Sequence, residues 1–173
     1  RDINFTRSTF YSDVTFKKAI FHGFANLQYI FFKSKSNFSN IYVYNVFDVT
    51  LSIFGISKFT GSIFKNGAIF RGTSFIGDAA FTKSVFLGPL TFAKQGNEIA
   101  QFFGHSDFTK AEFTGKTEFG SVEFNGTTSF RGVARVDGRI RARQFGGEAV
   151  FHNAKFGAEA DFTNREFLDK SDF

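Results

Sequence analysis

The chain has 173 residues, a length that suits one domain, and its net charge is +5. Thirty residues are Phe, whereas Cys, Met and Trp are absent, which excludes disulfides and thiolate metal sites. No apolar run in the sequence reaches the length of a transmembrane helix. A core drawn almost wholly from one large side chain indicates one environment repeated many times, so internal periodicity is the first property to test.

The phenylalanines recur at alternating spacings of five and six residues, as at Phe5, Phe10, Phe16 and Phe21, and this gives a repeat of eleven residues. We call the positions in this count ladder positions. The count gives 32 ladder positions, of which 26 are Phe. Aliphatic residues hold most of the others, among them Leu27, Val43, Val49 and Ile140.

A second position keeps the same register. Two residues before the 26 ladder phenylalanines, Ala, Ser, Thr or Val occurs in 21 cases. Alternation at period two places both residues on the same side of an extended segment. Turn-forming residues follow the Phe, as in 70–72 and 124–126. Short extended segments separated by tight corners predict a chain that winds into a coil and pairs each turn with the next in parallel.

Three single-residue slips interrupt the count, near residues 54–59, 92–102 and 130–145. Each slip predicts a bulge, a short loop or a change in the shape of the coil. The second slip places Asn97 in an interior position, or else the segment 93–103 forms a small bulged loop that also accounts for the extra Phe103.

The pattern resembles the pentapeptide-repeat family over essentially the whole chain, in the segments AIFRGTSFIGDAAFTKSVF, TKAEFTGKTEFGSVEFNGTTSF and AVFHNAKFGAEADF. It departs from that family in using Phe in place of Leu and in alternating spacings of five and six. The resemblance implies an all-β fold, a right-handed quadrilateral parallel β-helix. With four ladder positions per turn we expect about eight coils, roughly 35 Å long, around a stacked Phe core. Residues 1–173 then form a single solenoid, which we expect to be a fragment of a longer chain.

Aromatic residues gather in one stretch outside the ladder. Tyr29, Phe31, Tyr42, Tyr44 and Phe47 are expected at outward or corner positions. Exposed aromatic side chains grouped on one face are typical of contact surfaces, so we take these five as candidate partner contacts.

The segment Arg131–Arg143 carries a second candidate surface. Arg139, Arg141 and Arg143 alternate at period two, so on a strand they share one face. Guanidinium groups in a file can bind carboxylates or phosphates in bidentate fashion. The alternative is a locally distorted coil in which these side chains pair with neighbouring Glu residues.

The charge is divided between the two halves, with +6 in residues 1–93 and −1 in residues 94–173. A basic half favours an anionic partner, although a narrow rod also needs charge for solubility. His22, His105 and His152 match no metal-ligand spacing and are expected at the surface. The acidic residues just before ladder phenylalanines are expected to form a solvated face.

These patterns favour a non-catalytic structural scaffold or protein–protein interaction module, with no cofactor, no metal and no small-molecule substrate. The alternative is an anion- or nucleic-acid-binding module that uses the Arg131–Arg143 segment and the basic N-terminal half. A polysaccharide-acting β-helix enzyme would need clustered carboxylates, and here they are scattered. We expect a protein partner or a neighbouring subunit, which could also cover an open end of the coil, rather than nucleic acid. The pattern does not bear on membrane contact.

Overall fold

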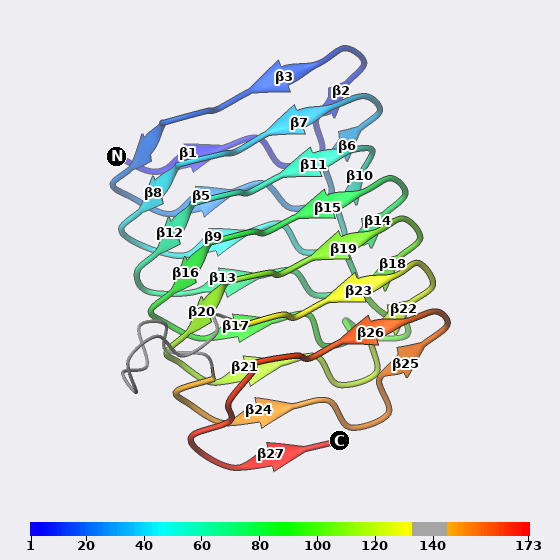
Figure 1. The fold of residues 1–173 in the computed structure, drawn as a ribbon. Helices are drawn as coiled ribbons and strands as arrows, with labels where there is room; N and C mark the ends of the chain where they lie inside the picture. Colours follow the sequence, from blue (N-terminus) through cyan, green and yellow to red (C-terminus); the bar gives the residue numbers. More distant parts are fainter. Residues whose placement is uncertain (133–144) are drawn as a thin grey trace.

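The computed structural model describes residues 1–132 and 145–173, and it shows a right-handed parallel β-helix with four sides (Figure 1). This part of the chain contains 27 strands of two residues each, and every pairing between them is parallel. The expected fold class is therefore confirmed. None of the described residues forms a helix that is long and apolar enough to cross a membrane.

Four sheets form the sides, and we name them A to D in the order in which the chain visits them. Sheet A consists of β1 (Ile3–Asn4), β5 (Ala25–Asn26), β9 (Phe47–Asp48), β13 (Ala68–Ile69), β17 (Leu90–Thr91), β21 (Thr117–Glu118), β24 (Ala149–Val150) and β27 (Ser171–Asp172). Sheet B consists of β2 (Thr9–Phe10), β6 (Phe31–Phe32), β10 (Ile53–Phe54), β14 (Ser74–Phe75), β18 (Gln101–Phe102), β22 (Glu123–Phe124) and β25 (Lys155–Phe156).

Sheet C consists of β3 (Val14–Thr15), β7 (Ser36–Asn37), β11 (Ser57–Lys58), β15 (Ala79–Ala80), β19 (Ser106–Asp107), β23 (Thr128–Ser129) and β26 (Ala160–Asp161). Sheet D consists of β4 (Ile20–Phe21), β8 (Tyr42–Val43), β12 (Ile63–Phe64), β16 (Val85–Phe86) and β20 (Glu112–Phe113). Isolated bridges from Phe113 to Phe145 and from Phe145 to Phe167 continue this side toward the C-terminus. One circuit of the four sides is a coil, and Ile3 pairs with Ala25 one coil later.

The two spacings of the repeat correspond to two kinds of corner. After sheets A and C the corner is short, and its second residue takes a positive φ, as at Arg7 (φ 61°) and Lys18 (φ 64°). The Ser8 N–H donates to the Phe5 carbonyl across the first of these corners at 3.1 Å, as in a type II turn. Counted between a ladder residue and the next small-residue position, the corner has two residues after sheets A and C and normally three after sheets B and D. Because the longer corners lie opposite each other, the four-sided cross-section is preserved.

The short corners make the outer faces of sheets A and C polar. In nine of the fifteen strands of these two sheets, the outward residue accepts a hydrogen bond from the backbone N–H two residues later. Asn4 Oδ1 accepts from the Thr6 N–H at 2.9 Å, and Asp107 Oδ1 accepts from the Thr109 N–H at 2.8 Å. Asn, Asp, Ser and Thr are suited to this local bond. The outward residues of sheets B and D make no such hydrogen bond, so these positions can carry apolar residues.

The core consists of the ladder residues stacked in columns. On sheet C the ring centroids of Phe16, Phe38 and Phe59 follow one another at 4.9 and 5.0 Å, with interplanar angles of 14° and 4°. From Phe21 to Phe151 every described ladder position except Asn97 is buried, including those that hold aliphatic residues. The rings of the first and last coils are partly exposed. The predicted Phe ladder is therefore confirmed as the core.

Phe47 corrects one part of the sequence interpretation. It was expected to point outward, but its side chain is fully buried. It holds the small-residue position two before Val49, in register with Ala25 and Ala68 on the adjacent strands. Val43 and Val49 fill their ladder positions only partly, because Val is smaller than Phe. The Phe47 ring occupies the space that remains, with its centroid 5.5 Å from that of Phe64.

Two of the three slips lie within the described residues, and both change the coil as predicted. Phe47 pairs with Ala68 after 21 residues instead of 22, because the corner at 54–59 lacks one residue. Leu90 pairs with Thr117 after 27 residues, and the extra five form a small loop closed by an antiparallel bridge between Gln95 and Glu98. Asn97 is exposed in this loop, so the bulged-loop interpretation is correct and the interior position is wrong. The prediction for 130–145 concerns residues 133–144, which lie outside the described residues.

Arg165 is an unexpected inward residue, because it holds a small-residue position two before Phe167. Its guanidinium donates hydrogen bonds to the carbonyls of Ala111 at 2.7 Å, Phe108 at 3.1 Å and Phe130. Its Cζ also lies 5.4 Å from the centroid of the Phe145 ring. Burial lowers the pKa of Arg165 to about 10. The Arg165 side chain therefore links its own coil to the two coils before it.

Candidate contact surface

The five aromatic candidates do not form one surface. Tyr29 lies at the corner between sheets A and B and is 48% exposed. Phe31 lies on the outer face of sheet B, whereas Tyr42 and Tyr44 lie on sheet D and at its following corner. Phe47 is in the core and cannot meet a partner. The stretch is contiguous in sequence, but a coil of 22 residues distributes it around the rod.

The arginine candidates Arg139, Arg141 and Arg143 lie outside the described residues. Arg131, at the start of that segment, is described and exposed. Its backbone N–H donates to Ser129 Oγ at 3.3 Å, which is the corner bond of sheet C.

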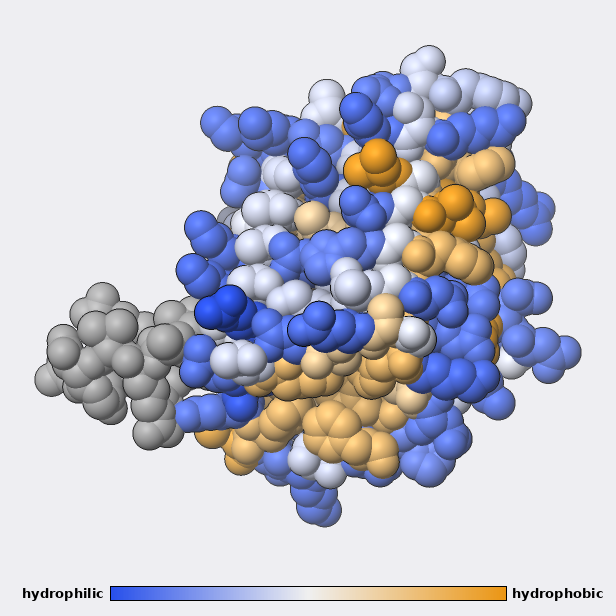
Figure 2. Space-filling view, turned by 45° about the vertical axis from the view of Figure 1, so that its right-hand side comes forward, coloured by the Kyte–Doolittle hydropathy of each residue, from blue (hydrophilic) through white to orange (hydrophobic). Residues whose placement is uncertain are grey.

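The edge between sheets B and C carries a strip of exposed apolar side chains. Phe31 and Ile53 are neighbours on adjacent strands of sheet B, and Ile76 and Phe103 follow ladder residues on the next two coils. Figure 2, which turns sheet B toward the viewer, shows orange side chains gathered on the upper right of the rod. We define the B/C edge by six residues whose exposed fractions range from 37% to 72%: Tyr11, Phe31, Ile53, Ile56, Ile76 and Phe103.

The corner between β10 and β11 is one residue shorter than the corners above and below it, and this leaves a depression in the B/C edge. Only Gly55 and Ile56 connect β10 to β11, whereas three residues, 33–35 and 76–78, form the corresponding corners of the neighbouring coils. Two grooves flank Ile56 as a result. The first measures about 250 Å³ and is lined by Asp13, Val14, Thr15, Lys35, Asn37, Ile56 and Lys58. The second measures about 230 Å³ and is lined by Ile56, Ser57, Lys58, Asp78, Ala79, Ala80, His105 and Asp107.

Charges of both signs border the B/C edge. The Lys33 ammonium lies 4.3 Å from the centroid of the Tyr11 ring, a cation–π contact that holds the lysine against the strip. Asp13 accepts hydrogen bonds from the Ser34 hydroxyl and from the Lys35 N–H, and these bonds lower the pKa of Asp13. A surface with an apolar centre and a mixed charged rim has the anatomy of a protein–protein interface.

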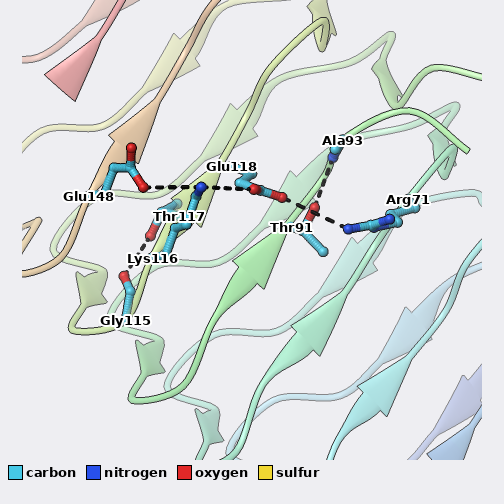
Figure 3. Close-up of polar contacts among 8 residues, drawn as sticks. All are labelled: Arg71, Thr91, Ala93, Gly115, Lys116, Thr117, Glu118 and Glu148. Carbon is cyan, nitrogen blue, oxygen red and sulfur yellow. Dashed lines mark hydrogen bonds and ion pairs between the residues drawn. The ribbon is translucent and has the colours of Figure 1, made fainter. Parts of the chain in front are cut away.

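The outer face of sheet A, in contrast, satisfies its charges internally. Lys116 Nζ lies 3.0 Å from Glu148 and 3.3 Å from Glu118, and Arg71 lies 4.0 Å from the same Glu118 (Figure 3). The hydrogen bond to Glu148 raises the pKa of Lys116. Exposed pairs of this kind add little stability, but they leave few free charges on this face for a partner.

The histidines lie at the surface, as predicted. His22 stacks on Tyr44 with centroids 5.0 Å apart, His105 Nδ1 lies 2.7 Å from the Thr127 hydroxyl, and His152 lies 3.8 Å from Asp172. Within residues 1–132 and 145–173, no three His, Asp or Glu side chains are grouped so that they could hold a metal ion.

No known protein family, curated protein or solved structure matches the chain. The geometry of the molecule itself therefore has to indicate its contact surfaces.

Sequence reasoning missed five of the six residues of the B/C edge. The signal was present, because each of these residues is either an outward residue of a sheet B strand or part of the corner that follows. Assigning each ladder position to one of four sides, rather than reading the aromatic residues as a contiguous stretch, would have placed Ile53, Ile76 and Phe103 on the same edge.

Proposed function

We propose that this chain is a non-catalytic protein-interaction module of the pentapeptide-repeat type, and that the B/C edge is the surface that binds its partner. The observation that carries the proposal is the alignment of six exposed apolar side chains along one edge of a rigid rod. Isolated exposed apolar residues are normal in soluble proteins, whereas a contiguous strip is typical of an interaction site.

Rigidity supports a role in presenting this edge. Each strand is hydrogen-bonded to the strands of the adjacent coils, and stacked rings fill the interior below it. A preformed surface loses little conformational entropy when it binds. The two grooves beside Ile56 offer recesses for side chains of a partner segment.

The rim indicates the chemistry of the partner. Lys33 and Lys35 lie on the same edge as Asp13 and Asp78, so neither an acidic nor a basic partner is favoured as a whole. A protein segment with apolar side chains and charges of both signs matches this edge. Buried apolar side chains would supply most of the affinity, and the charged rim would set the orientation.

Site-specific photo-crosslinking in cells that naturally contain the protein tests the proposal. A benzophenone amino acid replaces Ile76, which is 55% exposed, and in the matched control it replaces Val150, an outward residue of sheet A. We expect a discrete crosslinked product from position 76 and not from position 150. Adding Ile53→Lys to the first variant should abolish the product without changing the unfolding midpoint, because Ile53 points away from the core.

Equal crosslinking from both positions, or none from position 76, would contradict the proposal. A product with twice the mass of the chain would show that the edge binds a second copy of this chain and not a different protein.

A further inference from the structure

The outer face of sheet D is a second apolar surface with a different border. Its outward residues Ile20, Tyr42, Ile63 and Val85 are successive neighbours in the register of β4, β8, β12 and β16. Ile20 is 60% exposed, and the other three are partly exposed. The residues of this file therefore cover one side of the first four coils.

A parallel file lies beside it at the corner that follows sheet D. His22, Tyr44, Lys65 and Leu87 occupy equivalent positions, since each of the last three donates its backbone N–H to the ladder residue of the coil before. Tyr44 stacks on His22, and the Lys65 ammonium lies 5.5 Å from the Tyr44 ring centroid. Tyr44 and Leu87 are 40% and 44% exposed.

The two files run side by side along the rod, one on sheet D and one at the corner that follows it, and together they form one patch. Four coils at the strand spacing span about 14 Å. We name these eight residues the D patch: Ile20, His22, Tyr42, Tyr44, Ile63, Lys65, Val85 and Leu87.

Four lysines border the D patch on one side, and Lys65, which belongs to the patch, lies on the other. Lys17, Lys18, Lys83 and Lys110 are exposed at the corner before sheet D, and Lys65 lies at the corner after it. Exposed ammonium groups on both sides give this face a positive field of one sign.

The acidic residues of the first four coils lie elsewhere or are engaged. Asp13 and Asp78 lie on the B/C edge, and Asp48 lies on sheet A. Asp2, beyond the corner after sheet D, accepts the Phe24 N–H at 2.8 Å. Glu112, on β20, is the first acidic outward residue that follows the apolar file on sheet D.

The backbone at the lysine corner strengthens this observation. Lys18, Lys83 and Lys110 adopt φ values of 64°, 59° and 59°. Asn40 and Gly61 hold the same corner position in the second and third coils, and these residue types tolerate a left-handed backbone better than Lys does. The local conformation therefore does not account for the lysines at this corner.

We propose that the D patch docks on the surface of an anionic lipid bilayer. The aliphatic tips of Ile20 and Leu87 enter the boundary between headgroups and acyl chains, and Tyr42 and Tyr44 lie at the headgroup level, where amphipathic rings are favoured. The lysines at the two corners meet lipid phosphates and carboxylates. A protein partner would have to present acidic groups at positions that match these lysines around the apolar centre, whereas an anionic bilayer presents them at every orientation.

Vesicle flotation of the intact chain tests this proposal. We compare vesicles of phosphatidylcholine alone with an equal mixture of phosphatidylcholine and phosphatidylserine. We expect at least tenfold tighter binding to the mixed vesicles, weakening as salt is raised, since each lysine near an anionic surface contributes about fivefold. Ile20→Ser combined with Leu87→Ser should reduce binding about tenfold. At about fivefold per lysine, the replacement of Lys17, Lys18 and Lys83 by Gln should reduce it about a hundredfold.

The matched control carries Ile53→Ser and Ile76→Ser on the B/C edge, and it should bind the mixed vesicles as the unchanged chain does. This control separates the D patch from the proposed protein contact, because only the crosslink from position 76 depends on that edge. All these residues point outward, so unchanged circular dichroism and unfolding midpoints would show that each variant is folded.

Equal binding to both vesicle types, no binding to either, or D patch variants that bind normally would overturn the proposal. A doubled mass in solution that Ile20→Ser and Leu87→Ser abolish would assign the D patch to self-association instead. Binding to polyglutamate but not to vesicles would assign it to an acidic polypeptide.

Discussion

Replacing one ring in the middle of the core tests how the solenoid is stabilised. Phe119 is fully buried, and its ring stacks between those of Phe92 and Phe151, with both centroids 5.1 Å away. It also meets the edges of Phe108 at 5.5 Å and Phe130 at 5.2 Å. Phe119→Ala removes the ring from contacts on every side. We expect a loss of about 4 kcal/mol in the free energy of unfolding, within the range for large-to-small core substitutions.

The value lies in the upper part of that range because the gap cannot close. The Phe119 N–H donates to the Val150 carbonyl at 2.7 Å, and similar bonds hold the coils on both sides at a fixed spacing. The neighbouring rings thus remain two stacking distances apart. A cavity that cannot collapse is the more destabilising kind.

Urea unfolding followed by circular dichroism measures this loss, and two control variants accompany it. Phe173→Ala removes a ring that is 66% exposed and stacks on one neighbour, so about 1 kcal/mol is expected. Glu118→Ala removes an outward side chain with surface ion pairs and should cost less than about 1 kcal/mol. If Phe119→Ala loses no more than Phe173→Ala, the column of rings is not what stabilises the fold.

Three further predictions concern single side chains. Arg165→Ala should lower stability by about 2–3 kcal/mol by removing charge-assisted hydrogen bonds to three carbonyls, and a loss equal to that of the exposed Arg7→Ala would contradict this. Phe47→Ala should lose about 3 kcal/mol, and Val49→Phe in the same chain should restore part of it; a Phe47→Ala variant of normal stability would show that the ring is not packed. Burial raises the pKa of Asp107, but hydrogen bonds from Thr109 and Thr82 outweigh burial, so the pKa is lowered overall. The stability that Asp107 adds is therefore complete above about pH 4 and is lost as the pH falls further. When the free energy of unfolding is measured against pH, Asp107→Asn should lose less stability in acid than the unchanged chain.

The fold follows from the sequence because one physical rule is repeated many times. A ladder position and a small residue two before it describe an inward-facing pair, and dozens of agreeing positions fix the register of every coil. The corner chemistry was also readable in part, since the six-residue spacing locates the longer corners. With four ladder positions per turn, the alternation of five and six also places the longer corners opposite each other, which preserves the square.

The departures from this rule were harder to predict from the sequence, because they depend on residues that become neighbours only in the folded structure. Phe47 is buried because Val43 and Val49 leave room for its ring, and the sequence brings these residues together only once the coils are stacked. Arg165 is inward because carbonyls of two earlier coils meet its guanidinium. The aromatic stretch was misread as one surface because adjacency along the chain was taken for adjacency around the rod.

The division of the outer faces has a structural cause that bears on how this rod meets other molecules. Most outward residues on sheets A and C bind the N–H groups of the short corners, as Asp48 binds the Thr50 N–H at 2.9 Å, so an apolar replacement at those positions removes a hydrogen bond of the backbone. Outward residues on sheets B and D have no such bond, and an apolar residue can be placed on any coil without a change in the corner. Contact surfaces of this solenoid are therefore expected on sheets B and D, where Ile53 and Ile20 already lie exposed.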